Sequence, residues 1–158
     1  MRTGGSAWWP SPAYAAVPMN VAIIYESLTG NTRKVAQLIA QELSKAGATA
    51  TAFPITKIDF QALETADLLV VGTWTDGIII AGQRPGRAHR LRRMPVVDGK
   101  RCLVYCTYAV DQGKTLEKLT GIMQGRGANV LGGMAIKRNN LDGGAKEFVA
   151  RLLEAIPA

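Results

Sequence analysis

Five residues that suit anion binding stand close together just after an apolar run near the start of the chain: Ser27, Thr29, Gly30, Asn31 and Thr32. Their backbone N–H groups and side chains can converge on one anion at the point where a helix begins. A helix N-terminus favours an anion by about 0.3–1 kcal/mol, and each charge-assisted hydrogen bond adds roughly 1.5–3 kcal/mol. The loop therefore predicts a phosphate site that needs no Lys or Arg.

The two common nucleotide-binding motifs do not account for this loop. A P-loop requires G-x-x-x-x-G-K-[ST], and the dinucleotide fingerprint requires G-x-G-x-x-G after its first strand. Neither pattern is present in the chain. An ordinary helix cap remains an alternative, but a cap accounts for one or two residues of these types rather than five.

Two further loops each carry an aromatic residue directly after an apolar run. They comprise Thr73, Trp74, Thr75, Asp76 and Gly77 in the first, and Thr107, Tyr108 and Ala109 in the second. Trp74 either stacks on a flat ligand, at about 0.5–1.5 kcal/mol beyond plain burial, or folds back onto the core. A phosphate loop beside two aromatic loops predicts a ligand with a phosphate at one end and a flat ring at the other. FMN has that shape.

The elements that position these loops are five apolar runs alternating with helical periods. The runs predict strands over 21–25, 48–53, 66–73, 101–107 and 129–136. Helices are predicted over 31–46, 60–65, between Pro85 and Pro95, around 116–123 and over 144–155. This alternation predicts an α/β fold, a three-layer sandwich with a five-stranded parallel sheet. Ligands of such sheets bind beyond the carboxyl ends of the strands, where the three loops lie.

The length of 158 residues suits one domain with its own core. Residues 1–18 contain three prolines and no periodicity, which predicts a disordered N-terminal extension before a domain over 19–158 that starts at Met19. Cys102 and Cys106 fall on one face of one strand, too far apart for a disulfide, so we expect buried free thiols and a cytoplasmic protein. No apolar run approaches the roughly 18 residues of a membrane span.

The formal net charge of +7 is concentrated between Arg84 and Arg101, where seven basic residues face Asp98 alone. The patch expected to dock a partner comprises Arg84, Arg87, Arg90, Arg92 and Arg93. A positive patch steers anionic partners, although a solvated helix face is the equally good alternative. No aromatic platform for stacked bases accompanies it, so we predict no nucleic acid partner.

The segment from Tyr25 to Thr32 resembles the T/S-x-T-G-x-T phosphate loop of flavodoxins, and Gly72-Thr73-Trp74 resembles their tryptophan loop. The resemblance extends in order and spacing over 19–156. It implies a five-stranded parallel sheet of order 2-1-3-4-5 and non-covalent FMN. By the same resemblance, Ser27 through Thr32, with Leu28 among them, hold the phosphate. Thr73 through Gly77 would cover one face of the isoalloxazine, and Thr107, Tyr108 and Ala109 would border the other side.

Three features depart from the flavodoxin pattern. The third loop reads Thr-Tyr-Ala-Val-Asp, where flavodoxins usually have an acidic, glycine-rich loop, so either Trp74 or Tyr108 is the aromatic that stacks on the outer face of the flavin. The chain lacks the long insertion of larger flavodoxins and is similar to the short-chain type. Its basic charge also differs from the acidic surface of typical flavodoxins.

The function expected from this resemblance is an FMN-dependent electron carrier that shuttles electrons between a reductase and an acceptor, the redox chemistry being the cofactor's. The alternative is an oxidoreductase that acts directly on a quinone or a porphyrinogen. Residues 77–82 would give such a substrate an apolar entrance, unless they form a buried connection. A phosphorelay receiver is excluded because Thr73 and Trp74 stand where its phosphorylated Asp would be.

Overall fold

The computed structural model describes residues 19–77 and 82–156. Its strands are β1 (Asn20–Tyr25), β2 (Thr49–Pro54), β3 (Leu68–Asp76), β4 (Arg84–Pro85), β5 (Arg101–Tyr108) and β6 (Asn129–Lys137). The α-helices are α2 (Asn31–Lys45), α3 (Phe60–Thr65), α4 (Ala88–Leu91), α5 (Thr115–Gly125) and α6 (Leu141–Ala155). Two 3₁₀ turns complete it, η1 (Ile55–Lys57) and η2 (Arg138–Asn140). The expected N-terminal extension over 1–18 and most of the expected apolar entrance, 78–81, lie outside the described residues.

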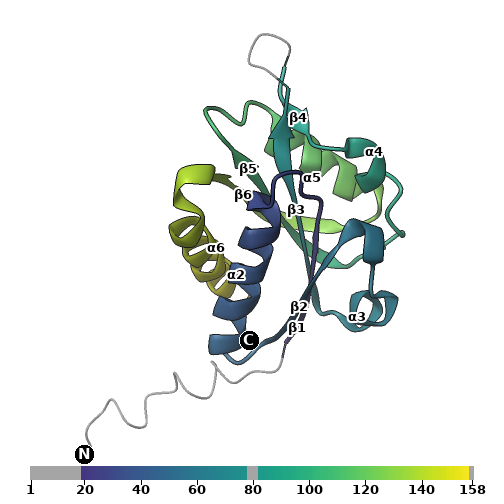
Figure 1. Cartoon of the computed structure of the whole chain (residues 1–158). Coiled ribbons are helices and arrows are strands. Elements are labelled where there is room, and N and C mark those ends of the chain that lie inside the picture. The colour runs from purple at the N-terminus through teal and green to yellow at the C-terminus, as the bar shows by residue number, and fades with distance from the viewer. Residues whose placement is uncertain (1–18, 78–81, 157–158) are drawn as a thin grey trace, which may run out of the picture.

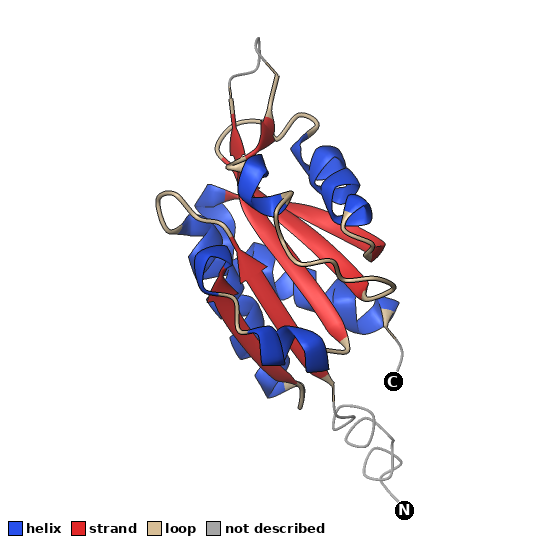
Figure 2. Cartoon of the chain, turned by 90° about the vertical axis from the view of Figure 1, so that its right-hand side faces the viewer, coloured by secondary structure: helices blue, strands red, loops and turns tan. Residues whose placement is uncertain are grey.

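The strands β2, β1, β3, β5 and β6 are neighbours in that order, and every pair along this path is parallel. Helices α2 and α6 cover one face of the sheet, while α3, α4 and α5 lie on the other side (Figures 1 and 2). The predicted three-layer sandwich and the strand order 2-1-3-4-5 are confirmed, β4 being outside the path. The sequence did not predict β4, which pairs Thr75 with Pro85 and Asp76 with Arg84 in antiparallel register.

The continuous apolar run at the start of β3 is accounted for by burial on both faces. Leu68 and Val70 belong to the core cluster under α2 and α6, whereas Leu69 and Val71 belong to the cluster under α3 and α5. All four side chains are inaccessible to solvent. A central parallel strand covered by helices on both sides requires this composition.

Both cysteines are buried and free, as the sequence predicts. Burial raises the pKa of the Cys102 thiol and of the Cys106 thiol to about 12 in each case. The reason is that a thiolate loses its hydration inside the core. Both groups are therefore protonated near neutral pH and inert toward electrophiles that need a thiolate.

The helix predicted between Pro85 and Pro95 is wrong in extent, because α4 has only four residues. The N–H of Gly86 donates to the carbonyl of Trp74 at 2.8 Å, and the hydroxyl of Thr73 donates to the carbonyl of Gly86 at 2.9 Å. These bonds tie the start of the segment to β3. Arg87 then takes a left-handed conformation (φ 48°), so a regular helix begins only after it.

Candidate functional site

The loop after β1 has the geometry of an anion site. Gly30 precedes α2 in a left-handed conformation (φ 102°), and its N–H donates to the Ser27 hydroxyl at 3.1 Å. The first bond of the helix runs from the N–H of Lys34 to the carbonyl of Gly30 at 2.9 Å. The N–H groups at positions 31–33 therefore precede the helical ladder and point out of its end, where an anion can accept them.

A buried tyrosine supports this loop from below. The hydroxyl of Tyr105 donates to the carbonyl of Thr32 at 2.8 Å, and the hydroxyls of Thr32 and Thr107 are hydrogen bonded at 3.0 Å. Tyr105 is completely buried, and burial raises the pKa of its phenol well above the ordinary value. Gly72, its register partner on β3, makes room for the ring, since a Cβ there would lie 2.0 Å from it. Strand β5 thus fixes the start of α2.

The three loops named by the sequence meet at one cavity of about 170 Å³. It is lined by Leu28, Thr29, Asn31, Thr32, Trp74, Thr75, Thr107, Tyr108 and Ala109, together with Arg138. The hydroxyl oxygen of Thr75 is buried and, apart from the weakly bonding thiol of Cys106, has no hydrogen-bond partner within the described residues. A polar ligand can satisfy a buried polar atom of this kind, so the chemistry of the lining residues fits a cofactor such as FMN.

The remaining predicted site residues lie around this cavity rather than in its wall. Ser27 and Gly30 line a second cavity of about 400 Å³, which shares Leu28 and Thr29 with the first. Thr73 is buried behind the site, with its hydroxyl engaged by Gly86. Asp76 forms an ion pair with Arg84 at 3.7 Å, and Gly77 is exposed at the turn that leaves β3. The structure thus brings nine of the fourteen predicted residues into one wall.

Trp74 is partly covered by the chain itself. The guanidinium carbon of Arg87 lies 5.4 Å from the centroid of the indole, a cation–π contact. A Cβ at Gly86 would lie 2.1 Å from the same ring, so only glycine allows the backbone this close. Trp74 nevertheless lines the cavity beside the phosphate loop. The indole therefore stands between its own chain and the candidate site.

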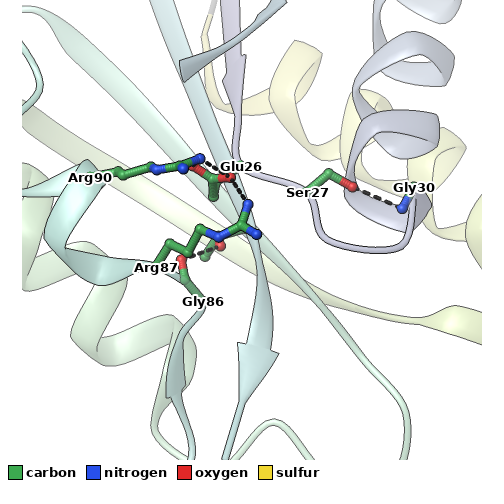
Figure 3. A network of polar contacts seen from close by, with 7 residues as sticks. Glu26, Ser27, Gly30, Gly86, Arg87 and Arg90 are labelled. Carbon is green, nitrogen blue, oxygen red and sulfur yellow. Dashed lines mark hydrogen bonds and ion pairs between the residues drawn. The ribbon is translucent and has the colours of Figure 1, made fainter. Parts of the chain in front are cut away.

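The basic segment is less charged than its sequence suggests. Arg87 and Arg90 pair with Glu26 at 2.9 and 3.2 Å, and Arg84 pairs with Asp76 (Figure 3 shows the contacts of Glu26). Sequence reasoning missed these carboxylates because Glu26 lies 61 residues from Arg87. A cavity of about 690 Å³ lies among Arg84, Arg87, His89, Arg92 and Lys118, with Asp76 and Trp74 also in its wall. It is a positively charged hollow adjoining the indole.

A comparison with known proteins agrees with this geometry. The model of a family described as "Flavodoxin domain" matches residues 22–124. The chain belongs to the flavodoxin domain family. FMN is the cofactor of this family, and the chain is a flavodoxin-type electron carrier. None of the described helices is long and apolar enough to cross a bilayer.

Individual relatives cover most of the chain. A flavodoxin from Clostridium beijerinckii is 25% identical over 120 residues, which is 76% of this chain and 87% of that protein. Oxidised Flavodoxin 1 from Bacillus cereus aligns with a TM-score of 0.66 and 19% identity, covering 89% of this chain and 99% of that one. Two-electron reduced flavodoxin from Megasphaera elsdenii gives a TM-score of 0.62 and 20% identity, covering 80% and 98%. These structures share the fold of this flavodoxin.

Sequence reasoning overlooked three residues of the site: Glu26, Tyr105 and Arg138. The position of Arg138 was available from the pattern, because it follows β6 directly and so lies at the ligand-binding edge of the sheet. Glu26 also follows a strand, but its partners become visible only in three dimensions. Tyr105 reads as one more apolar residue of a buried strand.

Proposed function

We propose that this flavodoxin binds FMN non-covalently in the cavity between its three loops and shuttles electrons between a reductase and an acceptor. The observation that carries the proposal is that Asn31 and Thr32 at the open start of α2, the buried Thr75 hydroxyl and two aromatic side chains meet at one cavity. Relatives of the same fold occur in an oxidised and a two-electron reduced state, which supports a redox role.

Residues at different positions along the cavity would contact different parts of the cofactor. The N–H groups at the start of α2 and the hydroxyl of Thr29 would hold the phosphate, while Arg138 would add a positive charge to the same cavity. Trp74 and Tyr108 would border the ring and exclude water from it. Thr75 would donate to a polar atom of the cofactor. When bound, FMN supplies the electron transfer itself.

The test compares FMN with riboflavin, which lacks the phosphate. FMN should bind with micromolar or tighter affinity, about −8 kcal/mol or better, and riboflavin far more weakly. Thr29→Ala should lose roughly 1–3 kcal/mol for FMN alone, because only FMN has the group that the hydroxyl contacts. Thr65→Ala, whose hydroxyl bonds the carbonyl of Gln61 on α3, is the control. Equal affinities for the two flavins would contradict the phosphate site.

We propose that the exposed basic segment, Arg84, Arg87, Arg90, Arg92 and Arg93, docks an acidic redox partner. Arg92 and Arg93 carry most of this proposal, since both are exposed and no ion pair to either occurs in the described part of the chain. Changing both to Glu should slow association steeply at low salt. The matched variant changes Lys45 on α2 and Lys146 on α6 to Glu, and it should leave the association rate unchanged. NADPH oxidation without a separate reductase would instead favour direct action on a small substrate.

We propose that this carrier works in the cytoplasm, because both of its cysteines are buried and free. Two buried thiols that stay reduced suit a compartment with a reducing thiol pool. Localisation of the tagged full-length chain, or fractionation of cells that express it, tests this placement.

A further inference from the structure

Glu26 is a buried carboxylate that joins two loops of the candidate site. It follows β1 directly, and its N–H donates to the carbonyl of Gly72 on β3 at 2.9 Å. Its residue exposure is only 3%. One carboxylate oxygen accepts from Arg87 at 2.9 Å, and Arg90 donates to both oxygens at 3.2 Å. The charge of Glu26 is therefore compensated inside the protein, by two residues of the segment after β3 (Figure 3).

Arg87 is held in an unusual backbone conformation. Among the described residues it is the only one other than glycine with a positive φ, at 48°. Such a conformation costs free energy and persists where surrounding contacts hold it, which makes it a pointer to function. In this conformation the guanidinium reaches Glu26 and also lies over Trp74, 5.4 Å from the ring centroid. A single side chain thus links Glu26, the residue directly before the phosphate loop, to the indole of Trp74.

The indole is confined by further contacts. The backbone carbonyl of Trp74 accepts from the N–H of Gly86, and the carbonyl of Gly86 accepts from the hydroxyl of Thr73. The backbone next to the ring is therefore fixed to β3. Gly86 has no side chain and therefore lets this backbone touch the ring. With Gly86 on the ring and Arg87 over it, Trp74 keeps one arrangement while it lines the cavity.

We propose that Arg87 is a positioning residue that fixes the indole of Trp74 for stacking on the flavin, and that Glu26 holds Arg87 in place. The phosphate loop and the tryptophan loop then act as one unit, joined by the Glu26–Arg87–Trp74 contacts. This inference rests on the proposed binding of FMN for its consequence, but the fixed indole is a property of the protein without ligand.

Arg90 offers a matched control for Arg87. Both arginines pair with the same carboxylate and are similarly exposed, the side chain of Arg90 being 39% accessible and that of Arg87 35%. Replacing either one by a neutral residue lowers the charge of the Glu26 cluster by one unit. Only Arg87 lies over Trp74. An effect of charge alone would appear equally in both variants, whereas an effect of positioning would appear only at Arg87.

The experiment uses the full chain with Trp8→Phe and Trp9→Phe, so that Trp74 is the only tryptophan. In the protein without FMN, Arg87→Asn should raise the acrylamide quenching constant of Trp74 at least twofold, while Arg90→Gln should leave it unchanged. Asn tolerates the left-handed backbone at this position, so the fold should be kept, as circular dichroism checks. Glu26→Gln should shift the quenching constant in the same direction as Arg87→Asn, because it removes the charge that holds Arg87. In Arg87→Lys, acrylamide should quench Trp74 as strongly as in Arg87→Asn, because an ammonium group lacks the planar face of the guanidinium.

The ligand readout separates the two ends of the cofactor. Arg87→Asn should weaken riboflavin and FMN by the same factor, five- to tenfold, because the lost contact concerns the ring and not the phosphate. Arg90→Gln should change either affinity less than twofold.

Equal quenching in wild type and Arg87→Asn, or equal changes in the Arg87 and Arg90 variants, would overturn the positioning role. If wild type bound neither flavin, the proposed function would fail, while the quenching result would still decide whether Arg87 fixes the indole.

Discussion

The two sides of the candidate cavity are built from different interactions. On the side of the loop after β1, buried neutral groups set the geometry: the Tyr105 phenol bonds the Thr32 carbonyl, and the Thr32 and Thr107 hydroxyls bond each other. On the side of the loop after β3, charged groups set the geometry, because the partly exposed Arg87 lies over Trp74 and pairs with the buried Glu26. The first side belongs to the core, and the second belongs to the surface.

This difference has consequences for rigidity. A buried hydrogen bond whose partner is removed leaves a polar group without water, at about 1–3 kcal/mol, so the phosphate side can hardly rearrange. Ion pairs and cation–π contacts near the surface exchange with water and respond to salt. We infer that core contacts hold the phosphate side, whereas the position of Trp74 depends on the contacts of Arg87 and is lost more easily when those contacts are removed. Substitutions matched across the two sides test this division.

The same substitution at two glycines should give the largest contrast. A Cβ at Gly72 would lie 2.0 Å from the buried Tyr105 ring, and one at Gly86 would lie 2.1 Å from the half-buried Trp74 ring. Because Tyr105 is completely buried whereas Trp74 is only partly buried, Gly72→Ala should lower the free energy of unfolding by about 3 kcal/mol or more, and Gly86→Ala by well under half of that. Urea unfolding of both variants measures the difference.

The fluorescence of Trp74 provides a second measurement for this comparison. Gly86→Ala should alter the emission of Trp74 in the chain without Trp8 and Trp9, whereas a Gly72→Ala chain that still folds should not. Equal stability losses at the two glycines would show that the packing around Trp74 is as rigid as the packing around Tyr105 in the core.

The predictability of the fold follows the same division between local and distant contacts. The alternation of buried runs and helices is a local signal, and it placed all five parallel strands within a few residues of their observed bounds. The phosphate loop was also visible, because its residues are contiguous and stand between a strand and a helix. Nine predicted residues meet at one cavity for this reason.

The parts that sequence reasoning missed depend on distant pairing. The segment around Arg87 reads as an amphipathic basic helix, but hydrogen bonds from Thr73 and Gly86 hold its start in β4 and a turn. Its apparent excess of charge is reduced by Glu26, which belongs to the first loop of the chain. Neither the sign nor the spacing of residues in one segment reveals a partner 61 positions away.

Alkaline pH should lower the free energy of unfolding through the two buried thiols. Cys102 and Cys106 keep their protons until pH about 12 in the folded chain, against an ordinary value of 9.0. Above pH 9 the unfolded chain loses these protons first, so the free energy of unfolding should fall as pH rises toward 12. The slope amounts to at most about 1.4 kcal/mol per thiol for each pH unit. Chemical unfolding at pH 8 and pH 10 measures it.

The control for this slope is a chain with Cys102→Ala and Cys106→Ala. Its absolute stability will be lower, but its stability should decline less between pH 8 and pH 10 than that of wild type. Parallel declines would contradict the assignment of the slope to the thiols. The pKa of Tyr105 is also raised by burial, so part of the decline should remain in the double variant.

Removing the phenol of Tyr105 should weaken the phosphate side alone. Tyr105→Phe keeps the ring against Phe148 but leaves the Thr32 carbonyl without its donor, at about 1–2 kcal/mol of stability. FMN affinity should fall more than riboflavin affinity, since the start of α2 is loosened. Titration with both flavins measures the ratio. A variant that lost both affinities equally would show that the two walls are coupled through the core.

The smallest effect should come from removing the charge of one of the two carboxylates, Asp76 and Glu26, that pair with arginines of the same segment. Asp76 and Arg84 lie 3.7 Å apart with side chains about half exposed (48% and 55%), whereas the Glu26 side chain is only 4% exposed. An exposed ion pair contributes about 0–1 kcal/mol and is screened by salt, so Asp76→Asn should change stability by less than about 0.5 kcal/mol. Glu26→Gln should cost clearly more, because it removes a buried negative charge, and one of the two acceptor oxygens, with which two arginines pair. Thermal unfolding at low salt and in 1 M NaCl measures both variants. If Asp76→Asn cost as much stability as Glu26→Gln at either salt concentration, burial would not decide the strength of these ion pairs. The position of Trp74 would then depend on all the charged residues around it rather than on Glu26.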